Sequence, residues 1–383
     1  MSRHDSDWTM NWSNGRDRME LKAHGAFTFT DDLSDVETMS DGGYLTITDW
    51  SDGQQRTVDI RSSGGRLTRT YRIGESPRPW DDEARRWLAS ELPRLVRRSG
   101  FGAESRVKSI FQKKGVAGVM DEVALLESDY VRRVYLTALI DIAHLDSAGA
   151  LPVLAVVGQR MTSDYDRGQV LQRIATTVKL DQRGAQAYVQ AMAPMRSDYE
   201  RRRVLTALFE SSGSAAQDSA VFTAISAMRS SYDTRIVLLE VLRRPSLTID
   251  MKKGVLVSAA GVTSDYDRAE ILLAYVQAFG IEPAARQPFF AALQRTTSDY
   301  DRRRVLTQVA AKGGVSREVQ ESAFDAVRAM RSDYDRAEVL LAFLKARAVD
   351  ASTRSAFVAA AESIKSSYDQ NRVLAALVKS EPQ

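Results

Sequence analysis

The residues best suited to acid–base chemistry are the paired carboxylates of a short phrase, Asp-Tyr-Asp, that recurs along the chain. In two of its copies, Asp164 with Asp166 and Asp299 with Asp301 flank a single tyrosine. Paired carboxylates serve as general acid and general base in many hydrolases. An active site is normally single, however, whereas a phrase repeated at many positions is typical of a repeating structure. We therefore expect a structural role for these carboxylates and predict that the chain is not an enzyme.

Other catalytic and metal-binding patterns are missing from the sequence. The three histidines, His4, His24 and His144, lack the spacing of metal ligands, and the chain contains no cysteine. The absence of cysteine excludes disulfides, thiolate nucleophiles and thiolate zinc sites, and no phosphate loop, dinucleotide fingerprint or nucleophile elbow occurs. The acidic segment 31–42 resembles a calcium loop only loosely, because the alternating spacing of calcium ligands is absent. We predict a solvated turn there, no metal and no cofactor.

Arginines form the second chemical pattern. One arginine stands two residues after most of the repeated tyrosines, and we expect it to bridge acidic groups of an adjacent repeat rather than to bind phosphate. Two arginine triplets are a possible basic contact, although three consecutive helical residues point in three directions. The expected bridging residues are Arg167, Arg201, Arg268, Arg302 and Arg336, and the triplets are Arg201, Arg202, Arg203 and Arg302, Arg303, Arg304.

The tyrosines of the phrase define an internal repeat. They follow one another at spacings of 35, 34, 33, 34, 34, 34 and 34 residues, and a period of this length is typical of one helical hairpin in a solenoid. We interpret them as a structural signature and as a possible recognition ladder. The ring of Tyr300 is expected to pack at a repeat junction, so that Tyr300→Ala destabilises the fold. The eight tyrosines are Tyr130, Tyr165, Tyr199, Tyr232, Tyr266, Tyr300, Tyr334 and Tyr368.

Each copy of the phrase also marks the start of a helix. A serine stands two residues before the tyrosine and an acidic residue one after it, which is the spacing of a capping box. Apolar residues follow with the helical period, and glycines such as Gly280 and Gly313 then indicate a helix end before a second helix. The predicted caps are Ser163, Ser197, Ser264, Ser298 and Ser332, with the acidic partners Asp166, Glu200, Asp267, Asp301 and Asp335.

These patterns predict an α+β fold, mostly α, in which a small antiparallel β domain precedes a right-handed α-solenoid of about eight helical hairpins. Residues 1–78 form the β domain, because short alternating runs are separated by turn dipeptides such as Asn14-Gly15 and Asp52-Gly53, and a meander of about five or six strands is expected. Residues 79–127 form connecting helices and an atypical first helical pair. Residues 128–383 form the solenoid, whose last unit has only its first helix.

All five tryptophans precede residue 88. In a domain as small as the β domain, tryptophans are expected to pack in the core or at a domain interface. Trp8 and Trp12 alternate on one predicted strand. They are therefore also the possible aromatic contact, an exposed patch that would bind a partner or a glycan.

Composition narrows the class of protein. Apolar residues make up 44% and charged residues 27%, which is the balance of a folded globular protein. The net charge of +3 is a weak surplus that disfavours nucleic-acid binding. No stretch approaches the length of a membrane helix, and the first dozen residues lack the apolar run of a secretory signal. We therefore expect a soluble chain, and the missing signal favours the cytoplasm.

Several residues from position 84 onward carry a resemblance to a known family. Arg86-Trp87-Leu88, Arg106-Val107, Gly115-Val116 and the Ser-Asp-Tyr-Asp phrases resemble helical-repeat regions of bacterial envelope proteins. Such regions are also attached to antirepressor-type membrane metallopeptidases of the β-lactam-sensor class, and the general architecture is similar to HEAT and tetratricopeptide solenoids. The peptidase zinc motif and the membrane helices are absent from this sequence, so the resemblance implies no proteolysis. It implies a periplasmic setting and possible peripheral association with a membrane complex.

Three functions are consistent with these observations. The first is a non-catalytic scaffold for protein–protein interaction, in which each repeat presents one side chain along a groove and the β domain caps the array or adds a second contact. The second is a sensory module of an envelope signalling system that binds a cell-wall fragment or another small ligand in the β domain. The third is a nucleic-acid-binding solenoid that uses the arginine-rich repeats.

Overall fold

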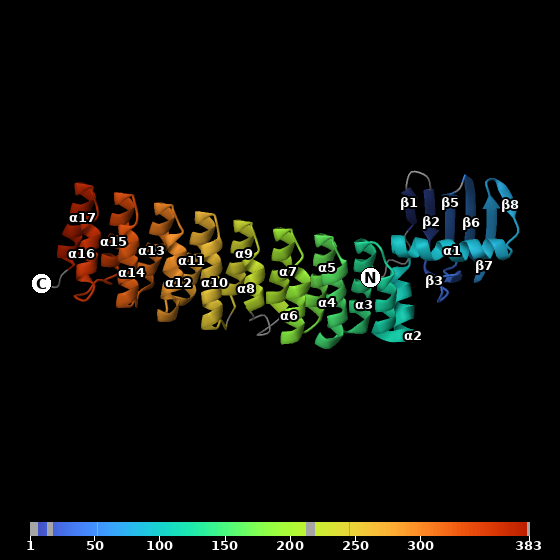
Figure 1. Ribbon diagram of the computed structural model, residues 1–383, viewed down its shortest axis with the longest axis horizontal. Helices are drawn as coiled ribbons and strands as arrows, with labels where there is room; N and C mark the ends of the chain where they lie inside the picture. Colours follow the sequence, from blue (N-terminus) through green and yellow to red (C-terminus); the bar gives the residue numbers. More distant parts are fainter. Residues whose placement is uncertain (1–6, 14–17, 52, 212–218, 245, 381–383) are drawn as a thin grey trace. The chain divides into compact units, whose positions relative to one another are not determined.

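The structure is a computed structural model that describes residues 7–13, 18–51, 53–211, 219–244 and 246–380. Strands precede a long series of helices (Figure 1), which confirms the predicted α+β, mostly α fold. The strands are β1 (Trp8–Ser13), β2 (Arg18–His24), β3 (Phe27–Phe29), β4 (Val36–Met39), β5 (Tyr44–Ser51), β6 (Gln54–Ser63), β7 (Arg66–Ile73) and β8 (Ser76–Arg78).

The helices begin directly after the last strand. They are α1 (Asp82–Ser99), α2 (Ala103–Ala124), α3 (Asp129–Ala143), α4 (Ser147–Arg160), α5 (Asp164–Thr177), α6 (Gln182–Met192), α7 (Asp198–Ser211), α8 (Ser219–Ser226), α9 (Ser231–Leu242), α10 (Ile249–Gly261), α11 (Asp265–Phe279), α12 (Arg286–Gln294), α13 (Asp299–Lys312), α14 (Arg317–Arg328), α15 (Asp333–Lys345), α16 (Arg354–Glu362) and α17 (Ser367–Lys379). Among the described residues, none of these helices combines the length and the apolar character needed to cross a membrane.

The β domain is built on an antiparallel sheet with the strand order β1-β2-β5-β6-β7-β8. Strands β3 and β4 form a separate hairpin between β2 and β5, so the expected meander is interrupted there. Alternate residues of the sheet face its core, where Leu21, Ile47 and Val58 are fully buried together with Leu88 of α1. The predicted turns at Asn14-Gly15 and Asp52-Gly53 involve residues outside the described ones.

The segment that follows the sheet is helical as predicted. Helix α1 continues through Pro93 to Ser99. Gly115 has φ 63° and ψ −160° and divides α2 into two helical segments, as the predicted pair requires. The buried carboxylate of Glu122 in α2 pairs with Arg97 at 2.9 Å and with Arg106 at 3.1 Å. Burial raises the pKa of Glu122, but the two guanidinium groups outweigh that effect and hold the pKa below its ordinary value.

The chain forms two compact units, Met1–Lys179 and Leu180–Gln383. The first contains the β domain and α1–α5, and α3 packs beside α5. In the second unit the odd-numbered helices α7–α17 form one row and the even-numbered helices α6–α16 form another (Figure 1), and each helix contacts the next one in its row. Successive tyrosine phrases therefore begin neighbouring helices of a single row.

The apolar faces of the hairpins make a continuous core within each unit. In the Tyr266 repeat, Ile271, Leu272 and Tyr275 of α11 are fully buried, and the Tyr275 ring lies 6.2 Å from the ring of Phe289 in α12. Burial of such a side chain stabilises a fold by about 1.5–3 kcal/mol. The apolar residues that follow the helical period in the sequence are thus the residues that form the core.

The serine caps form as predicted, but the capping boxes are not reciprocal. Ser298 Oγ accepts the N–H of Asp301 at 3.2 Å. The backbone N–H group of Ser298 donates to the carboxylate group of Asp265, which belongs to the preceding repeat, at 2.9 Å. The acidic residue that would complete the box, Asp301, pairs instead with Arg304 at 3.1 Å. A neighbouring repeat therefore supplies the contact that we expected from the same helix.

Candidate recognition surface

The eight repeated tyrosines, which we call the tyrosine row, are exposed. Their exposed fractions run from 45% at Tyr130 to 74% at Tyr368, and Tyr300 is 57% exposed. The Tyr300 ring, which we expected to pack at a repeat junction, leaves more than half of its surface exposed to solvent and contacts the guanidinium groups of Arg303 and Arg304. The reason is its place in the second position of the helix, before the apolar face of α13 begins at Val305.

The tyrosines of the row differ from the tyrosines of the core. Tyr135, Tyr188 and Tyr275 are fully buried, and the hydroxyl group of Tyr188 donates to the carbonyl group of Val204 at 3.0 Å. The hydroxyl groups of the row, by contrast, form no hydrogen bond with any described residue. Each repeat thus presents an aromatic ring with a free donor and acceptor to the solvent.

Guanidinium groups lie between successive rings of the row. Arg303 lies 5.1 Å from the ring centre of Tyr300 and 5.4 Å from that of Tyr334. Arg304 lies 5.7 Å from Tyr266 and 5.9 Å from Tyr300. These are cation–π distances. The same sandwich forms around Arg133 in the first unit and around Arg202 and Arg235 in the second.

Seven of the eight tyrosines are followed by an acidic residue, which receives a guanidinium partner from one of two places; Tyr130 is followed by Val131 instead. Arg303, three residues after its tyrosine, pairs with Asp335 of the next repeat at 3.2 Å. Where the preceding repeat has no arginine at that position, the partner comes from the same helix, as for Asp301 with Arg304. Pairs of the first kind are Arg133–Asp166, Arg202–Asp233, Arg235–Asp267 and Arg303–Asp335, and pairs of the second kind are Arg203–Glu200, Arg304–Asp301 and Arg372–Asp369.

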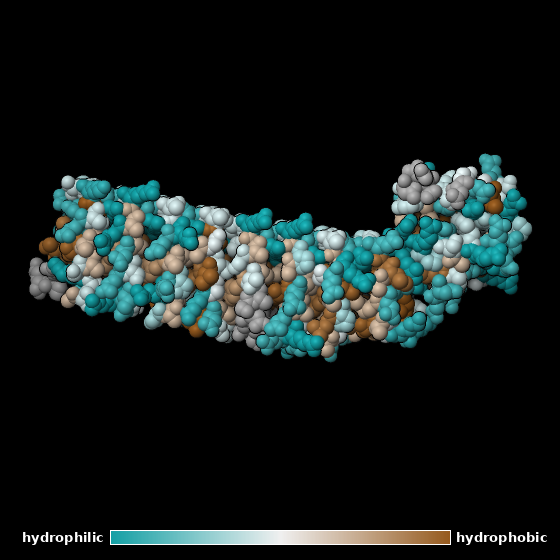
Figure 2. All heavy atoms as spheres, viewed as in Figure 1, coloured by the Kyte–Doolittle hydropathy of each residue, from teal (hydrophilic) through white to brown (hydrophobic). Residues whose placement is uncertain are grey.

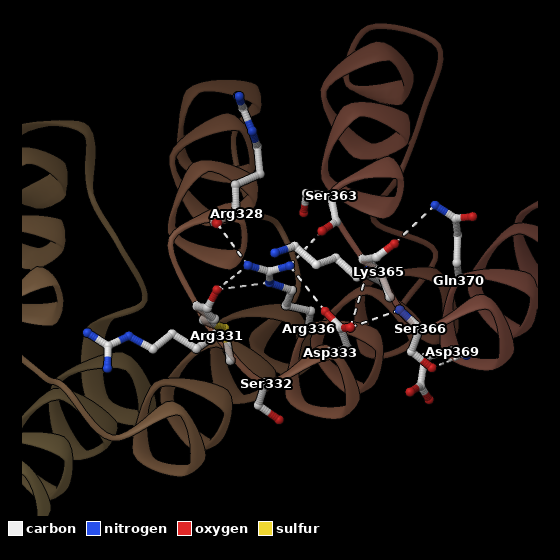
Figure 3. Close-up of polar contacts among 12 residues, drawn as sticks. Arg328, Arg331, Ser332, Asp333, Arg336, Ser363, Lys365, Ser366, Asp369 and Gln370 are labelled. Atoms are coloured by element: carbon white, nitrogen blue, oxygen red, sulfur yellow. Dashed lines mark hydrogen bonds and ion pairs between the residues drawn. The ribbon is translucent and has the colours of Figure 1, made fainter.

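A second polar cluster, which we call the junction pair, consists of the aspartate before the tyrosine and the arginine two residues after it. In Figure 3 the carboxylate of Asp333 accepts the backbone N–H groups of Lys365 and Ser366, at 3.2 and 2.8 Å, at the start of the next helix of the row. The guanidinium group of Arg336 pairs with Asp333 at 3.2 Å and donates to the carbonyl group of Ser363 at 2.6 Å. Arg336 also donates to the carbonyl group of the preceding Met330.

These contacts correct the role predicted for the arginines. The expected bridge to an acidic group of an adjacent repeat is wrong for this position, because each arginine pairs with the aspartate of its own repeat. Its other acceptors are backbone carbonyl groups and, for Arg268, also the hydroxyl group of Thr296. The junction pairs are Asp129–Arg132, Asp164–Arg167, Asp198–Arg201, Asp265–Arg268, Asp299–Arg302 and Asp333–Arg336. The bridging between acid and base of adjacent repeats is carried out by the next arginine along, as at Arg303.

Two repeats replace both members of the junction pair. The Tyr232 repeat has Ser231 and Thr234, and the last repeat has Ser367 and Gln370. Whenever the aspartate is missing, the arginine is missing too. A guanidinium group as buried as that of Arg268, which is 4% exposed, would be left without its counter-ion if the aspartate alone were replaced.

The two arginine triplets do not form an unpaired basic patch. Arg201 and Arg302 belong to junction pairs, Arg202 and Arg303 pair with the next repeat, and Arg304 pairs with Asp301 and with Glu270 at 2.5 Å. Arg203 pairs with Glu200 at 3.2 Å. The arginines of both triplets are therefore balanced by carboxylate groups. Figure 2 shows hydrophobic residues in small groups between hydrophilic ones over the face in view.

The other candidate sites have local structural roles. Trp8 and Trp12 lie on the half-buried face of β1 and pack against the core of the β domain, where Trp8 meets the ring of Phe101 edge-on at 5.6 Å. In the acidic turn, Asp31 pairs with Lys113 at 2.6 Å, and hydrogen bonds from Ser34 and Thr30 lower the pKa of Asp32 to about 2. No group of three metal-ligating side chains occurs within the described ranges.

Comparisons of this chain with protein-family models, with curated proteins and with solved structures give no match. The assignment of the tyrosine row as a candidate surface is therefore based only on the exposures and contacts described above. Sequence reasoning had identified the tyrosines but had missed the interleaved guanidinium groups. The sequence did contain a signal, because the position three after the tyrosine is an arginine in four of the eight repeats: Arg133, Arg202, Arg235 and Arg303.

Proposed function

We propose that this chain is a non-catalytic scaffold for protein–protein interaction and that the tyrosine row is its docking surface. The observation that carries the proposal is the exposure of the row: each of its tyrosines is between 45% and 74% exposed to solvent. Tyrosine is among the residues that contribute most to binding at protein interfaces, because a large rigid ring loses little conformational entropy when it is covered.

The arginines between the rings suit this role as well. Ion pairs such as Arg303–Asp335 and Arg304–Glu270 fix the guanidinium planes beside the rings, so the surface is ordered before a partner arrives. A pre-organised surface lowers the entropic cost of association. Because the charges are balanced, the row suits a partner whose contact surface is aromatic, apolar or neutral polar.

The other two candidate functions have less support. A nucleic-acid-binding solenoid would need unpaired cations to replace the counter-ions of a phosphate backbone, whereas the arginines of both triplets already have carboxylate partners. A sensory β domain would need an exposed site, whereas Trp8 and Trp12 are directed at its core. The periplasmic setting and a membrane-associated partner remain expectations from the resemblance.

Photo-crosslinking in the source cells tests the proposal. A benzoylphenylalanine residue is introduced at Tyr266 or at Tyr300, and at Gln287 as the control, because Gln287 is also exposed but lies on α12 in the other row of helices. We expect the two tyrosine positions to capture the same protein and Gln287 to capture none. Equal capture at Gln287, or no adduct from any position in the row, would contradict the proposal.

Affinity measurements with the captured protein then assign the contribution of the rings. The triple variant Tyr266→Ala, Tyr300→Ala, Tyr334→Ala is expected to weaken binding by at least about tenfold, which corresponds to about 1.4 kcal/mol. Gln287→Ala is the matched control and is expected to bind like the parent chain. Unchanged affinity of the triple variant would show that the partner docks elsewhere.

A further inference from the structure

The Tyr232 repeat holds a cavity at the place where other repeats hold an arginine. Thr234 stands at the arginine position and Ser231 at the aspartate position of the missing junction pair. The cavity has a volume of about 80 Å³. The volume open to the centre of a water-sized sphere needs to be only about 10–15 Å³ to hold one water molecule, so the cavity admits a larger group. Its polar and apolar lining includes Met228, Arg229, Ser231, Thr234, Val257 and Gly261.

The cavity contains the acceptors that hold guanidinium groups in other repeats. Arg336 donates to the carbonyl group of Met330, six residues earlier, and to that of Ser363, 27 residues later. In the Tyr232 repeat the equivalent acceptors are Met228 and Gly261, and both residues line the cavity. The acceptor geometry of a junction pair is therefore present without its donor.

The side chains around the cavity do not take the place of that donor. The hydroxyl group of Thr234 donates to the carbonyl group of Ser230 at 2.8 Å, and the hydroxyl group of Ser231 is bonded to that of Thr263 at 2.9 Å. Within the described part of the chain, the carbonyl group of Met228 accepts no hydrogen bond. Gly261 is the last residue of α10, where carbonyl groups lack intrahelical donors. The partial negative charge of two helix ends, those of α8 and α10, favours a cation here.

The last repeat indicates what such a site takes when the aspartate is absent. Ser367 stands at the aspartate position there, and Gln370 stands at the arginine position. The amide Nε2 of Gln370 donates to the carbonyl group of Ile364 at 3.2 Å, which again lies six residues earlier. A planar N–H donor therefore occupies this position even without a carboxylate beside it.

We propose that the cavity of the Tyr232 repeat binds a guanidinium group, and that an arginine side chain of a partner protein supplies it. A guanidinium group offers five N–H donors in a plane, which suits two separated carbonyl acceptors better than the compact ammonium group of lysine does. Val257 is 64% exposed at the cavity and offers an apolar contact for the methylene groups of arginine. Arg229 also lines the cavity, but its side chain is exposed to solvent, where salt screens its charge.

The proposal does not depend on the tyrosine row as a docking surface, and small probes test it directly. Backbone amide resonances of the full chain are followed while Nα-acetylarginine methylamide, its lysine analogue or methylguanidinium is added up to about 20 mM, well above a millimolar Kd. We expect saturable shifts at Met228, Thr234 and Gly261 with the arginine probe. The lysine analogue is expected to bind at least about tenfold more weakly.

Two variants fill the cavity from within. Ser231→Asp with Thr234→Arg restores a junction pair, and Thr234→Gln copies the Ser–Gln pair of the last repeat. Both are expected to stay folded, as circular dichroism would verify, and to lose the shifts. The reverse change, Asp299→Ser with Arg302→Thr, is expected to open a second site and to double the number of bound probes.

Three outcomes would overturn the proposal. Absence of shifts in the parent chain would mean that water alone occupies the cavity, and shifts that persist in both filled variants would mean that the probe binds elsewhere. Tighter binding of methylguanidinium than of the arginine probe would identify a small free guanidinium compound as the ligand, and would overturn the assignment to a partner's side chain.

Discussion

Two kinds of tyrosine occur in the helical repeats, and their surroundings give opposite expectations for substitution. Tyr300 is exposed and contacts Arg303 and Arg304, whereas Tyr275 is fully buried. Tyr300→Ala is expected to lower the free energy of unfolding by less than about 1 kcal/mol, the value of a cation–π contact at an exposed site. Tyr275→Ala is expected to cost about 3–5 kcal/mol, as for other buried aromatic residues. Urea denaturation of both variants measures the difference, and comparable losses would contradict it.

The carboxylate of Asp265 makes stability depend on pH. Burial raises its pKa, but hydrogen bonds from Thr297, Ser298 and Arg268 outweigh burial and hold the pKa below its ordinary value of 3.8. A lowered native pKa stabilises the fold above pH 3.8, and this stabilisation is lost as the pH falls through the native pKa. Asp265→Asn is therefore expected to cost about 1–3 kcal/mol at pH 7, and to differ less from the parent chain in denaturation measured below pH 3.8. A difference that does not change with pH would argue against this role.

At the scale of the helix, the junction pair acts as one unit. Arg336 is a nearly buried cation whose carboxylate partner, Asp333, also caps the next helix of the row. Asp333→Ser alone leaves the guanidinium group without a counter-ion, so it is expected to cost about 3–5 kcal/mol. The double change Asp333→Ser with Arg336→Thr, which copies the Tyr232 repeat, is expected to cost less than the sum of the single changes by about 0.5–3 kcal/mol. A thermodynamic cycle measures this coupling, and additive effects would refute it.

The same elements show how far sequence reasoning reached. The serine caps, the helical period and the break at Gly115 were predictable, because each depends on residue types within a few positions of one another. The exposure of Tyr300 was not, since an aromatic ring at the second position of a helix has the same local sequence whether a neighbour covers it or not. The acceptors of Arg336 could not be predicted either, because every residue has a backbone carbonyl group and the sequence does not show which ones lie near the arginine. The sequence also did not predict that β2 pairs with β5 and leaves β3 and β4 as a separate hairpin, because the alternating pattern of a strand does not identify its partner.

At the scale of the whole chain, two deletions of equal length are expected to differ in their effect on stability, because the Tyr300 repeat has Arg303 where the Tyr266 repeat has Ala269. Removal of residues 299–332 joins Ser298 to Asp333 and takes away Arg303 and Arg304, the partners of Asp335 and Glu270. Removal of residues 265–298 is of equal length and leaves both Arg303 and Arg304 with an acidic partner. Each repeat contacts mainly its neighbours, so both shortened chains are expected to fold. The first is expected to melt a few degrees lower in circular dichroism, because its carboxylates lose their guanidinium partners. Equal melting temperatures would mean that the row of ion pairs contributes little.

The caps supplied from one repeat to the next give the stack a polarity. Asp299 of α13 accepts the N–H groups of Arg331 and Ser332 at the start of α15, the next helix of the row. No acidic residue of α15 makes the same contact with the start of α13. A break in the stack therefore has two unlike sides. The upstream side keeps a carboxylate that water can solvate, and the downstream side keeps two bare N–H groups at a helix start. Loss of helices from the C-terminal end is therefore expected to cost little free energy, because it exposes only carboxylate groups. Each folded helix of the row also offers a carboxylate cap to the next one, so folding is expected to proceed from the N-terminal helices toward the C-terminal ones, the direction of synthesis.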